Sequence, residues 1–188
     1  MICKQALRYN FVKKGTFVKH IYILLLSFSL SLAMFEKIDS YDATFTQSVT
    51  DDKGKTLTYK GHITASKPQN ALWSYKEPIQ KDVYINSRQI TIVEPEIEQV
   101  IIRSIDSSLD FFNMIKNAKE IKKGVYEASF EGKIFTITTK ETIIESISYI
   151  DEFENRVKIV FENQIQNADI NQEIFIPKYP LDFDIIRD

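Results

Sequence analysis

The sequence predicts a mainly β protein with some α structure, in which one antiparallel sheet curls into an unclosed barrel. From residue 40 onward, apolar and polar residues mostly alternate with a period of two, and turn residues recur about every eight to twelve positions. The chain has 188 residues, of which 44% are hydrophobic, so it suits one domain with a substantial core. A flat sheet of roughly ten strands would leave an apolar face in water. We therefore expect a half-barrel covered by helices that act as a lid.

The first 33 residues form a segment of their own. They contain five basic residues and no acidic one, and an apolar run over 21–33 ends in the small-x-small pattern Ser31-Leu32-Ala33. This order is typical of a secretory signal peptide, and the run is shorter than the roughly 20 residues of a membrane-spanning helix. We therefore predict a signal peptide over residues 1–33 and a mature domain over 34–188. An uncleaved membrane anchor is the alternative.

Removal of this segment would change the charge of the protein. The 24 Lys and Arg residues would fall to 19 while all 26 Asp and Glu residues remain, so the formal charge would change from −2 to −7. Nucleic acids require a basic surface, so we expect no nucleic-acid partner. Cys3, the single cysteine, would also be lost. The mature protein is therefore expected to have no disulfide and no lipid-modified cysteine at its cleavage point.

The first two strands form the clearest hairpin of the sequence. Alternating runs over 45–49 and 57–63 enclose Asp51-Asp52-Lys53-Gly54, which has the chemistry of a hairpin turn. Gly61 interrupts the second run, and a glycine inside a strand favours a bulge or a bend. We expect it to help the sheet curve.

The remaining elements follow from short alternating runs between turn residues and from one helical pattern. A helix is predicted from Ser108 to Ala118, because Leu109, Phe112 and Ile115 recur at helical spacing behind a serine cap. A shorter helix is predicted over 34–40. Further strands are predicted over 70–75, 83–85, 90–93, 99–103, 125–130, 134–138, 143–150, 157–161 and 173–176.

Signatures of an enzyme are nearly absent. After residue 33 the sequence contains one histidine, His62, and no cysteine, which excludes a Cys/His dyad and a thiolate or multi-histidine metal site. His62 alternates onto the polar face of its strand, so we interpret it as a surface residue. Glu94, Glu96 and Glu98 lie in a Pro-containing turn, which favours a solvated edge over a cation site. We predict no enzyme activity, no cofactor and no metal.

Four short motifs, taken in order, point to a family. They are Phe45-Thr46-Gln47, then Gly61, then Lys67-Pro68-Gln69-Asn70-Ala71-Leu72-Trp73-Ser74-Tyr75 with Glu77-Pro78, then Val93-Glu94-Pro95-Glu96-Ile97-Glu98-Gln99-Val100. Their order and spacing within residues 41–188 resemble the LolA family of outer-membrane lipoprotein carriers, especially its Campylobacter and Helicobacter members. The resemblance implies an unclosed barrel covered by helices, an apolar cavity for acyl chains, and a periplasmic location.

The resemblance also implies partners and site residues. We expect acylated lipoproteins as cargo, an inner-membrane ABC transporter that loads them, an outer-membrane acceptor, and a monomeric carrier. Lys67 stands where the family usually has arginine and implies a weaker lid latch, because lysine lacks the planar fork of donors. Ala71 replaces a usual aromatic residue, and Asn86-Ser87 replaces a common Asp-Gly turn. The residues expected to contact lipid are Phe45, Leu57, Tyr59, Ala71, Trp73, Tyr75, Val100, Ile102, Leu109, Phe112 and Ile115.

Other functions remain open at the level of the sequence. The same half-barrel would serve an envelope sensor or lipid-binding domain that detects lipoproteins, although a sensor normally carries a second domain or an anchor. An outer-membrane acceptor lipoprotein is disfavoured because no cysteine stands at the cleavage point, and a periplasmic hydrolase because enzyme motifs are lacking. Trp73 and the apolar face of the predicted helix suit a filled core as well as a cavity wall.

Overall fold

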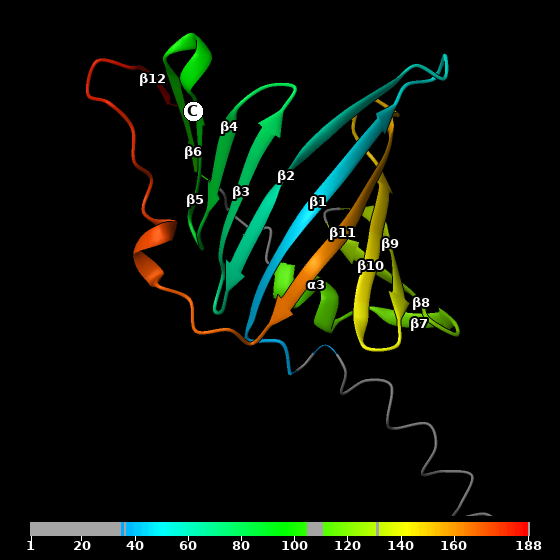
Figure 1. Cartoon of the computed structure of the whole chain (residues 1–188). Helices are drawn as coiled ribbons and strands as arrows, with labels where there is room; N and C mark the ends of the chain where they lie inside the picture. Colours follow the sequence, from blue (N-terminus) through cyan, green and yellow to red (C-terminus); the bar gives the residue numbers. More distant parts are fainter. Residues whose placement is uncertain (1–34, 36, 105–110, 131, 188) are drawn as a thin grey trace, which may run out of the picture. The chain divides into compact units, whose positions relative to one another are not determined.

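The computed structural model describes residues 35, 37–104, 111–130 and 132–187. Every described residue belongs to one compact unit, Leu32–Asp188. In this described part, twelve strands form one sheet with the order β12-β6-β5-β4-β3-β2-β1-β11-β10-β9-β8-β7 (Figure 1). The strands are β1 (Ser40–Thr50), β2 (Thr56–Ser66), β3 (Asn70–Glu77), β4 (Lys81–Ile85), β5 (Gln89–Glu94), β6 (Gln99–Ser104), β7 (Lys119–Lys122), β8 (Val125–Phe130), β9 (Lys133–Lys140), β10 (Ile143–Ile150), β11 (Arg156–Gln166) and β12 (Asp184–Arg187).

The sheet is unclosed and curled. Its neighbouring strands are antiparallel except for β12, which runs parallel to β6, and the strand order ends at β12 on one edge and β7 on the other. Val83 of β4 and Phe130 of β8 line the same cavity, although seven strand spacings separate their strands. At about 4.8 Å per spacing, these strands would lie roughly 34 Å apart in a flat sheet. The sheet must therefore curl, and the expected unclosed, mainly antiparallel architecture is confirmed.

The predicted hairpin is confirmed in β1 and β2. Asp51 Oδ1 accepts hydrogen bonds from the backbone N–H groups of Lys53 (3.0 Å) and Lys55 (2.8 Å), and Gly54 adopts a φ of 82°. Glycine suits this position because it adopts a positive φ without a steric clash. The register between β2 and β3 shifts at the expected place, between Lys60 and Gly61, but the extra residue of this bulge is Lys76 on β3.

The predicted strands between 70 and 161 all occur, most of them longer than the alternating runs indicated. The strand predicted over 173–176 is wrong: Gln172–Phe175 forms a 3-10 helix, η2, in which the Asn171 side chain accepts a hydrogen bond from Glu173 N at 3.0 Å. Two edge strands, β7 and β12, were not predicted. All four residues of β7 are exposed, so its sequence lacks the alternation of apolar and polar residues by which a half-buried strand is predicted.

Helices are few among the described residues. The helix predicted from Ser108 to Ala118 is seen as α3 (Phe111–Lys116), and residues 108–110 of the prediction lie outside the described residues. The helix predicted over 34–40 is wrong at its end, because 37–39 form a turn and Ser40 begins β1. A short 3-10 helix, η1 (Pro95–Ile97), precedes β6. No helix in the described part is both long and apolar enough to cross a membrane.

Apolar residues gather on both faces of the sheet. The larger cluster lies on the inner face and includes Phe45, Phe161 and, from α3, Phe112 and Ile115. A second cluster lies on the other face of β3–β6, because successive strand residues point to opposite sides. There the C-terminal segment packs against the sheet, and Asp184 N donates to Glu98 O at 2.8 Å. The second cluster consists of Tyr84, Val93 and Val100, with Leu72, Ile102, Tyr179, Phe183 and Ile185 packed against them.

Candidate functional site

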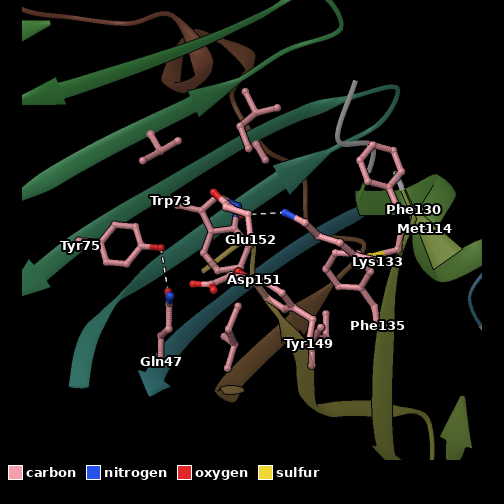
Figure 2. Close-up of a pocket in the computed structure, with 15 residues that line it drawn as sticks. Gln47, Trp73, Tyr75, Met114, Phe130, Lys133, Phe135, Tyr149, Asp151 and Glu152 are labelled. Atoms are coloured by element: carbon pink, nitrogen blue, oxygen red, sulfur yellow. Dashed lines mark hydrogen bonds and ion pairs between the residues drawn. The ribbon is translucent and has the colours of Figure 1, made fainter. Parts of the chain in front are cut away.

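A cavity of about 410 Å³ lies on the inner face of the curled sheet. This volume falls within the roughly 300–1,000 Å³ typical of small-molecule pockets. Most of its wall is apolar or aromatic, and α3 contributes one residue to it, Met114 (Figure 2). The lining residues are Gln47, Ala71, Trp73, Tyr75, Val83, Ile85, Met114, Phe130, Lys133, Phe135, Ile147, Tyr149, Asp151, Glu152 and Ile159.

Three aromatic side chains, Phe45, Trp73 and Tyr75, pack together in the part of the cavity wall formed by β1 and β3. The Phe45 ring meets Trp73 and Tyr75 edge to face, with centroid separations of 5.1 Å in both pairs. Phe45 has room for this because its cross-strand neighbour is Gly61: a Cβ there would lie 2.6 Å from Phe45 Cζ. The glycine therefore allows the close approach of the Phe45 ring and of the Ser74 carbonyl oxygen on β3.

Polar side chains lie at one end of the cavity. The Tyr75 hydroxyl donates to Gln47 Oε1 at 2.9 Å, and Lys133 Nζ forms an ion pair with Glu152 Oε2 at 2.8 Å (Figure 2). Burial raises the pKa of the Tyr75 hydroxyl above its ordinary value, and the neighbouring Tyr149 adds to the rise. The hydrogen bond between Lys133 and Glu152 raises the pKa of the lysine and lowers that of the carboxyl group. Tyr75 therefore stays neutral and the ion pair stays charged near neutral pH.

The structure brings together only part of the predicted lipid-contact set. Ala71, Trp73 and Tyr75 line the cavity. Phe45 packs against Trp73 and Tyr75 without lining it, and Tyr59 meets the Tyr75 ring edge to face at 6.0 Å. Leu57 is 49% exposed.

The predicted residues of β6 and the helix are placed differently. Val100 and Ile102 belong to the cluster on the opposite face of the sheet, so their assignment to the cavity is corrected: alternation along β6 points them away from it. Phe112 and Ile115 are buried in the inner cluster and are not among the lining residues. Leu109 lies outside the described residues.

Lys67, the expected lid latch, lies in the turn between β2 and β3. Its Nζ forms an ion pair with Asp39 Oδ1 at 2.7 Å, and its backbone N–H donates to Asp39 O at 2.9 Å. Lys67 therefore ties this turn to the residues that lead into β1. Its action on a lid remains a prediction.

The residues considered for chemistry lie apart from one another, on β2 and at η1. His62 Nε2 lies 2.9 Å from Asp42 Oδ2, which also accepts a hydrogen bond from Thr64 Oγ1 at 2.8 Å. This group sits on a polar strand face, as expected for His62. Glu96 and Glu98 are exposed at η1, and the described residues include no group of three or more His, Cys, Asp or Glu side chains arranged to hold a metal.

Several cavity residues escaped the sequence analysis. Gln47 was placed in a strand and in the Phe45-Thr46-Gln47 motif but not among the expected lipid contacts, and Lys133, Asp151 and Glu152 carry no expectation. The alternation in β9 and β10 was a usable signal for Phe135, Ile147 and Tyr149, since those residues share a face with the buried ones. Pairing of β10 with β11 and of β11 with β1 was needed to place them opposite β3.

An open sheet whose inner face holds an apolar cavity defines a class of protein that binds an apolar ligand. Comparison with known proteins then identifies the family. The family model described as "Outer membrane lipoprotein carrier protein LolA" matches residues 36–178, and the chain therefore belongs to the LolA family.

Relatives agree with this membership, and a solved structure shares the fold. An outer-membrane lipoprotein carrier protein of Campylobacter jejuni is 42% identical over 79% of this chain and 87% of its own length. A protein of the same name from Wolinella succinogenes is 33% identical over 85% of this chain and 93% of its own length. An uncharacterized conserved protein from Thermus thermophilus shares the fold, with a TM-score of 0.52 at 11% identity, over 87% of this chain and 99% of that one.

Proposed function

We propose that the protein is a periplasmic carrier, and not an enzyme, that binds the acyl chains of lipoproteins released from the inner membrane and delivers them to the outer membrane. The observation that carries this proposal is the apolar cavity on the inner face of the unclosed sheet. Membership of the LolA family supports it, as do relatives whose names describe them as outer-membrane lipoprotein carriers.

The physical need for such a cavity follows from the cost of exposing lipid. At about 0.8 kcal/mol per CH₂, a long acyl chain exposed to water costs on the order of 10 kcal/mol. A lipoprotein therefore requires an apolar surface during its passage between membranes. The wall formed by Trp73, Ile147 and Ile159 offers that surface without being filled by the protein's own side chains.

Within this proposal, the direct acyl contacts come from the cavity wall. Ala71, Trp73 and Tyr75 contribute from β3 and Met114 from α3, while Phe45 and Tyr59 hold the aromatic rings in place. We assign α3 to the lid that closes this side of the cavity. Phe112 and Ile115 anchor α3 in the inner cluster. Because Met114 belongs to the same helix, any movement of α3 would also move Met114.

The Lys67 latch belongs to the same proposal. The ion pair with Asp39 would restrain the segment that enters β1, and an exposed pair of this kind contributes about 1 kcal/mol or less. Lys67→Arg should tighten the restraint and slow the release of a bound lipoprotein, whereas Lys67→Leu should impair loading or transfer. Transfer of a labelled lipoprotein to outer-membrane vesicles measures both effects. Unchanged transfer rates in both variants would reduce Lys67 to a surface residue.

Export requires that residues 1–33 act as a cleaved signal peptide. We propose that the mature chain begins between residues 30 and 36, after the basic stretch and the apolar run. N-terminal sequencing of protein recovered from the periplasm tests this. Retention of the segment from Lys4 to Lys19 would contradict it.

The partners proposed are an inner-membrane ABC transporter that loads the carrier and an outer-membrane acceptor that unloads it, with the carrier acting as a monomer. The central experiment is native mass spectrometry of the protein purified from the cell envelope, combined with transfer of labelled lipoprotein between membrane vesicles. Bound lipoprotein together with transfer supports a carrier. Bound lipoprotein without transfer would instead support a sensor.

A cavity-filling variant makes this experiment specific. Ala71→Leu adds bulk to the cavity wall and should reduce the amount of lipoprotein that copurifies. Ala168→Leu adds the same bulk at a half-buried position outside the lining and is the matched control. Equal loading of both variants would contradict the assignment of this cavity to acyl chains.

A further inference from the structure

The cavity changes in chemical character along the strands. On β3, the lining residues Ala71, Trp73 and Tyr75 follow one another toward the turn between β3 and β4. On the opposite wall, Ile147 and Tyr149 follow one another along β10 toward the turn between β10 and β11. In both walls, aliphatic residues therefore come first and hydroxyl-bearing residues come last.

These two turns lie at the same end of the sheet. β1 is antiparallel to its two neighbours, β2 and β11. β3 is antiparallel to β2, and β10 is antiparallel to β11. β1, β3 and β10 therefore run in the same direction. Gln47, Tyr75 and Tyr149 all lie near the ends of these strands, and they define the polar end of the cavity. Ala71 lies four residues before Tyr75, so about 13 Å of strand separates the polar end from the apolar end.

Gln47 and Tyr75 form a hydrogen-bonded pair at this polar end. Because the Tyr75 hydroxyl donates to Gln47 Oε1, both hydrogens of Gln47 Nε2 remain available. Within the described residues, no hydrogen bond from Nε2 satisfies them. In the register of the sheet Gln47 stands opposite Ile159 on one side and Tyr59 on the other, and the charged residues Lys133, Asp151 and Glu152 line the same cavity.

Packing holds the pair in a defined position. The Tyr75 ring meets Phe45 at 5.1 Å and Tyr59 at 6.0 Å, and Lys81 Nζ lies 4.9 Å from the centre of the same ring. The hydroxyl that fixes the orientation of the Gln47 amide is therefore itself fixed. A preorganised donor of this kind binds an acceptor with little loss of side-chain entropy.

From this arrangement we infer that Gln47, oriented by Tyr75, is a specificity-determining residue that donates a hydrogen bond to the ester carbonyl of a bound acyl chain. The ester carbonyl accepts hydrogen bonds and donates none, so it complements the amide hydrogens. It also stands where an acyl chain joins its polar head, so the hydrocarbon would extend along the wall toward Ala71. This inference rests on the proposed function and adds the orientation and chemical class of the ligand.

The test compares ligands that differ only in the carbonyl. The full chain is expressed, purified from the envelope and freed of lipid, and displacement of a fluorescent probe from the cavity is measured. The competing ligands are cysteine carrying a glyceryl group with two ester-linked hexadecanoyl chains, and the same compound with two ether-linked hexadecyl chains. Wild-type protein should bind the ester about tenfold more tightly, which corresponds to about 1.4 kcal/mol.

Two variants remove the proposed interaction by different routes. Gln47→Met keeps the length of the side chain and deletes its amide, whereas Tyr75→Phe keeps the ring and deletes the hydroxyl that orients the amide. Both should bring the two affinities within about twofold of each other, a loss of most of the tenfold preference. Tyr179→Phe removes a tyrosine hydroxyl in the cluster on the opposite face of the sheet, away from the cavity, so it is the matched control and should keep the preference.

The outcomes separate this inference from the proposed function. Equal binding of ester and ether by wild-type protein, or an ester preference that survives Gln47→Met, overturns the role of Gln47 while leaving lipid carriage intact. Failure of wild-type protein to bind either compound overturns both. Binding of the cysteine diester is also compared with binding of a diester phospholipid that has the same acyl chains. Tighter binding of the cysteine compound supports a lipoprotein as the natural ligand, and tighter binding of the phospholipid supports a membrane lipid.

Discussion

Replacing Gly61 with alanine should destabilise the protein by displacing the ring of Phe45. The new Cβ would lie 2.3 Å from the carbonyl oxygen of Ser74 and 2.6 Å from Phe45 Cζ, closer than such atoms approach in proteins. Overpacking of this kind costs about 1–3 kcal/mol. Weakened edge contacts of Phe45 with Trp73 and Tyr75 add about 0.5–1.5 kcal/mol each, while the lower chain entropy of alanine returns about 0.4–1 kcal/mol.

The expected net loss is about 3 kcal/mol, which for a chain of this size lowers the melting temperature by about 6–12 °C. Thermal unfolding followed by circular dichroism measures the shift. Gly61→Ala should also cost at least about 0.5 kcal/mol less in a Phe45→Leu background, because leucine lacks the ring atoms that the new Cβ meets. An unchanged melting temperature would refute the packing argument, and equal costs in both backgrounds would show that the Phe45 ring is not the obstacle.

Three further predictions concern α3, the ion pair and the buried tyrosine. Phe112→Ala should lower the free energy of unfolding by about 3–5 kcal/mol, as measured by urea unfolding. Met114→Ala should instead change lipid affinity, as measured by probe displacement, more than it changes stability. A larger loss of stability for Met114→Ala and a larger change in affinity for Phe112→Ala would contradict this. Lys133→Met breaks the ion pair with Glu152, but these side chains are 38% and 62% exposed, so the loss should stay below about 1 kcal/mol and shrink in high salt. A loss that is larger, or independent of salt, would argue against this. Because burial raises the pKa of Tyr75 in the folded state, the contribution of Tyr75 to stability should be constant below pH 10 and fall as the pH rises above the ordinary tyrosine pKa of 10.0, since the unfolded chain ionises first. Tyr75→Phe should make alkaline unfolding, measured by fluorescence, less steep.

The elements that the sequence predicted correctly carry strong local signals. The turn at 51–54 supplies its own hydrogen bonds through Asp51, and the register shift beside Gly61 falls at a glycine inside an alternating run. These features depend on residues close together in the chain. They can therefore be predicted without knowledge of what packs against them.

Elements without such signals were missed or misread. Lys119–Lys122 is a strand because it hydrogen-bonds to β8, and its own residues are all exposed. Asp184–Arg187 is a strand because the C-terminal segment returns to pair with β6. Ile174 and Ile176 are two residues apart, as on one face of a strand, yet the cap formed by Asn171 and the burial of Phe175 make Gln172–Phe175 helical.

The sequence by itself determined that the protein is mainly β, that its sheet has a strongly apolar face, and that four motifs resemble those of the LolA family, because alternation and turn chemistry are local properties. Only the tertiary structure decided which apolar residues face the cavity. Val100 and Trp73 look alike as alternating strand residues, but one packs under the C-terminal segment and the other lines the cavity. Likewise, Gln47 and Tyr75 are 28 residues apart and meet only because β2 pairs with both β1 and β3. Strand pairing over such distances depends on long-range packing, and for that reason the cavity and its polar end emerged only with the fold.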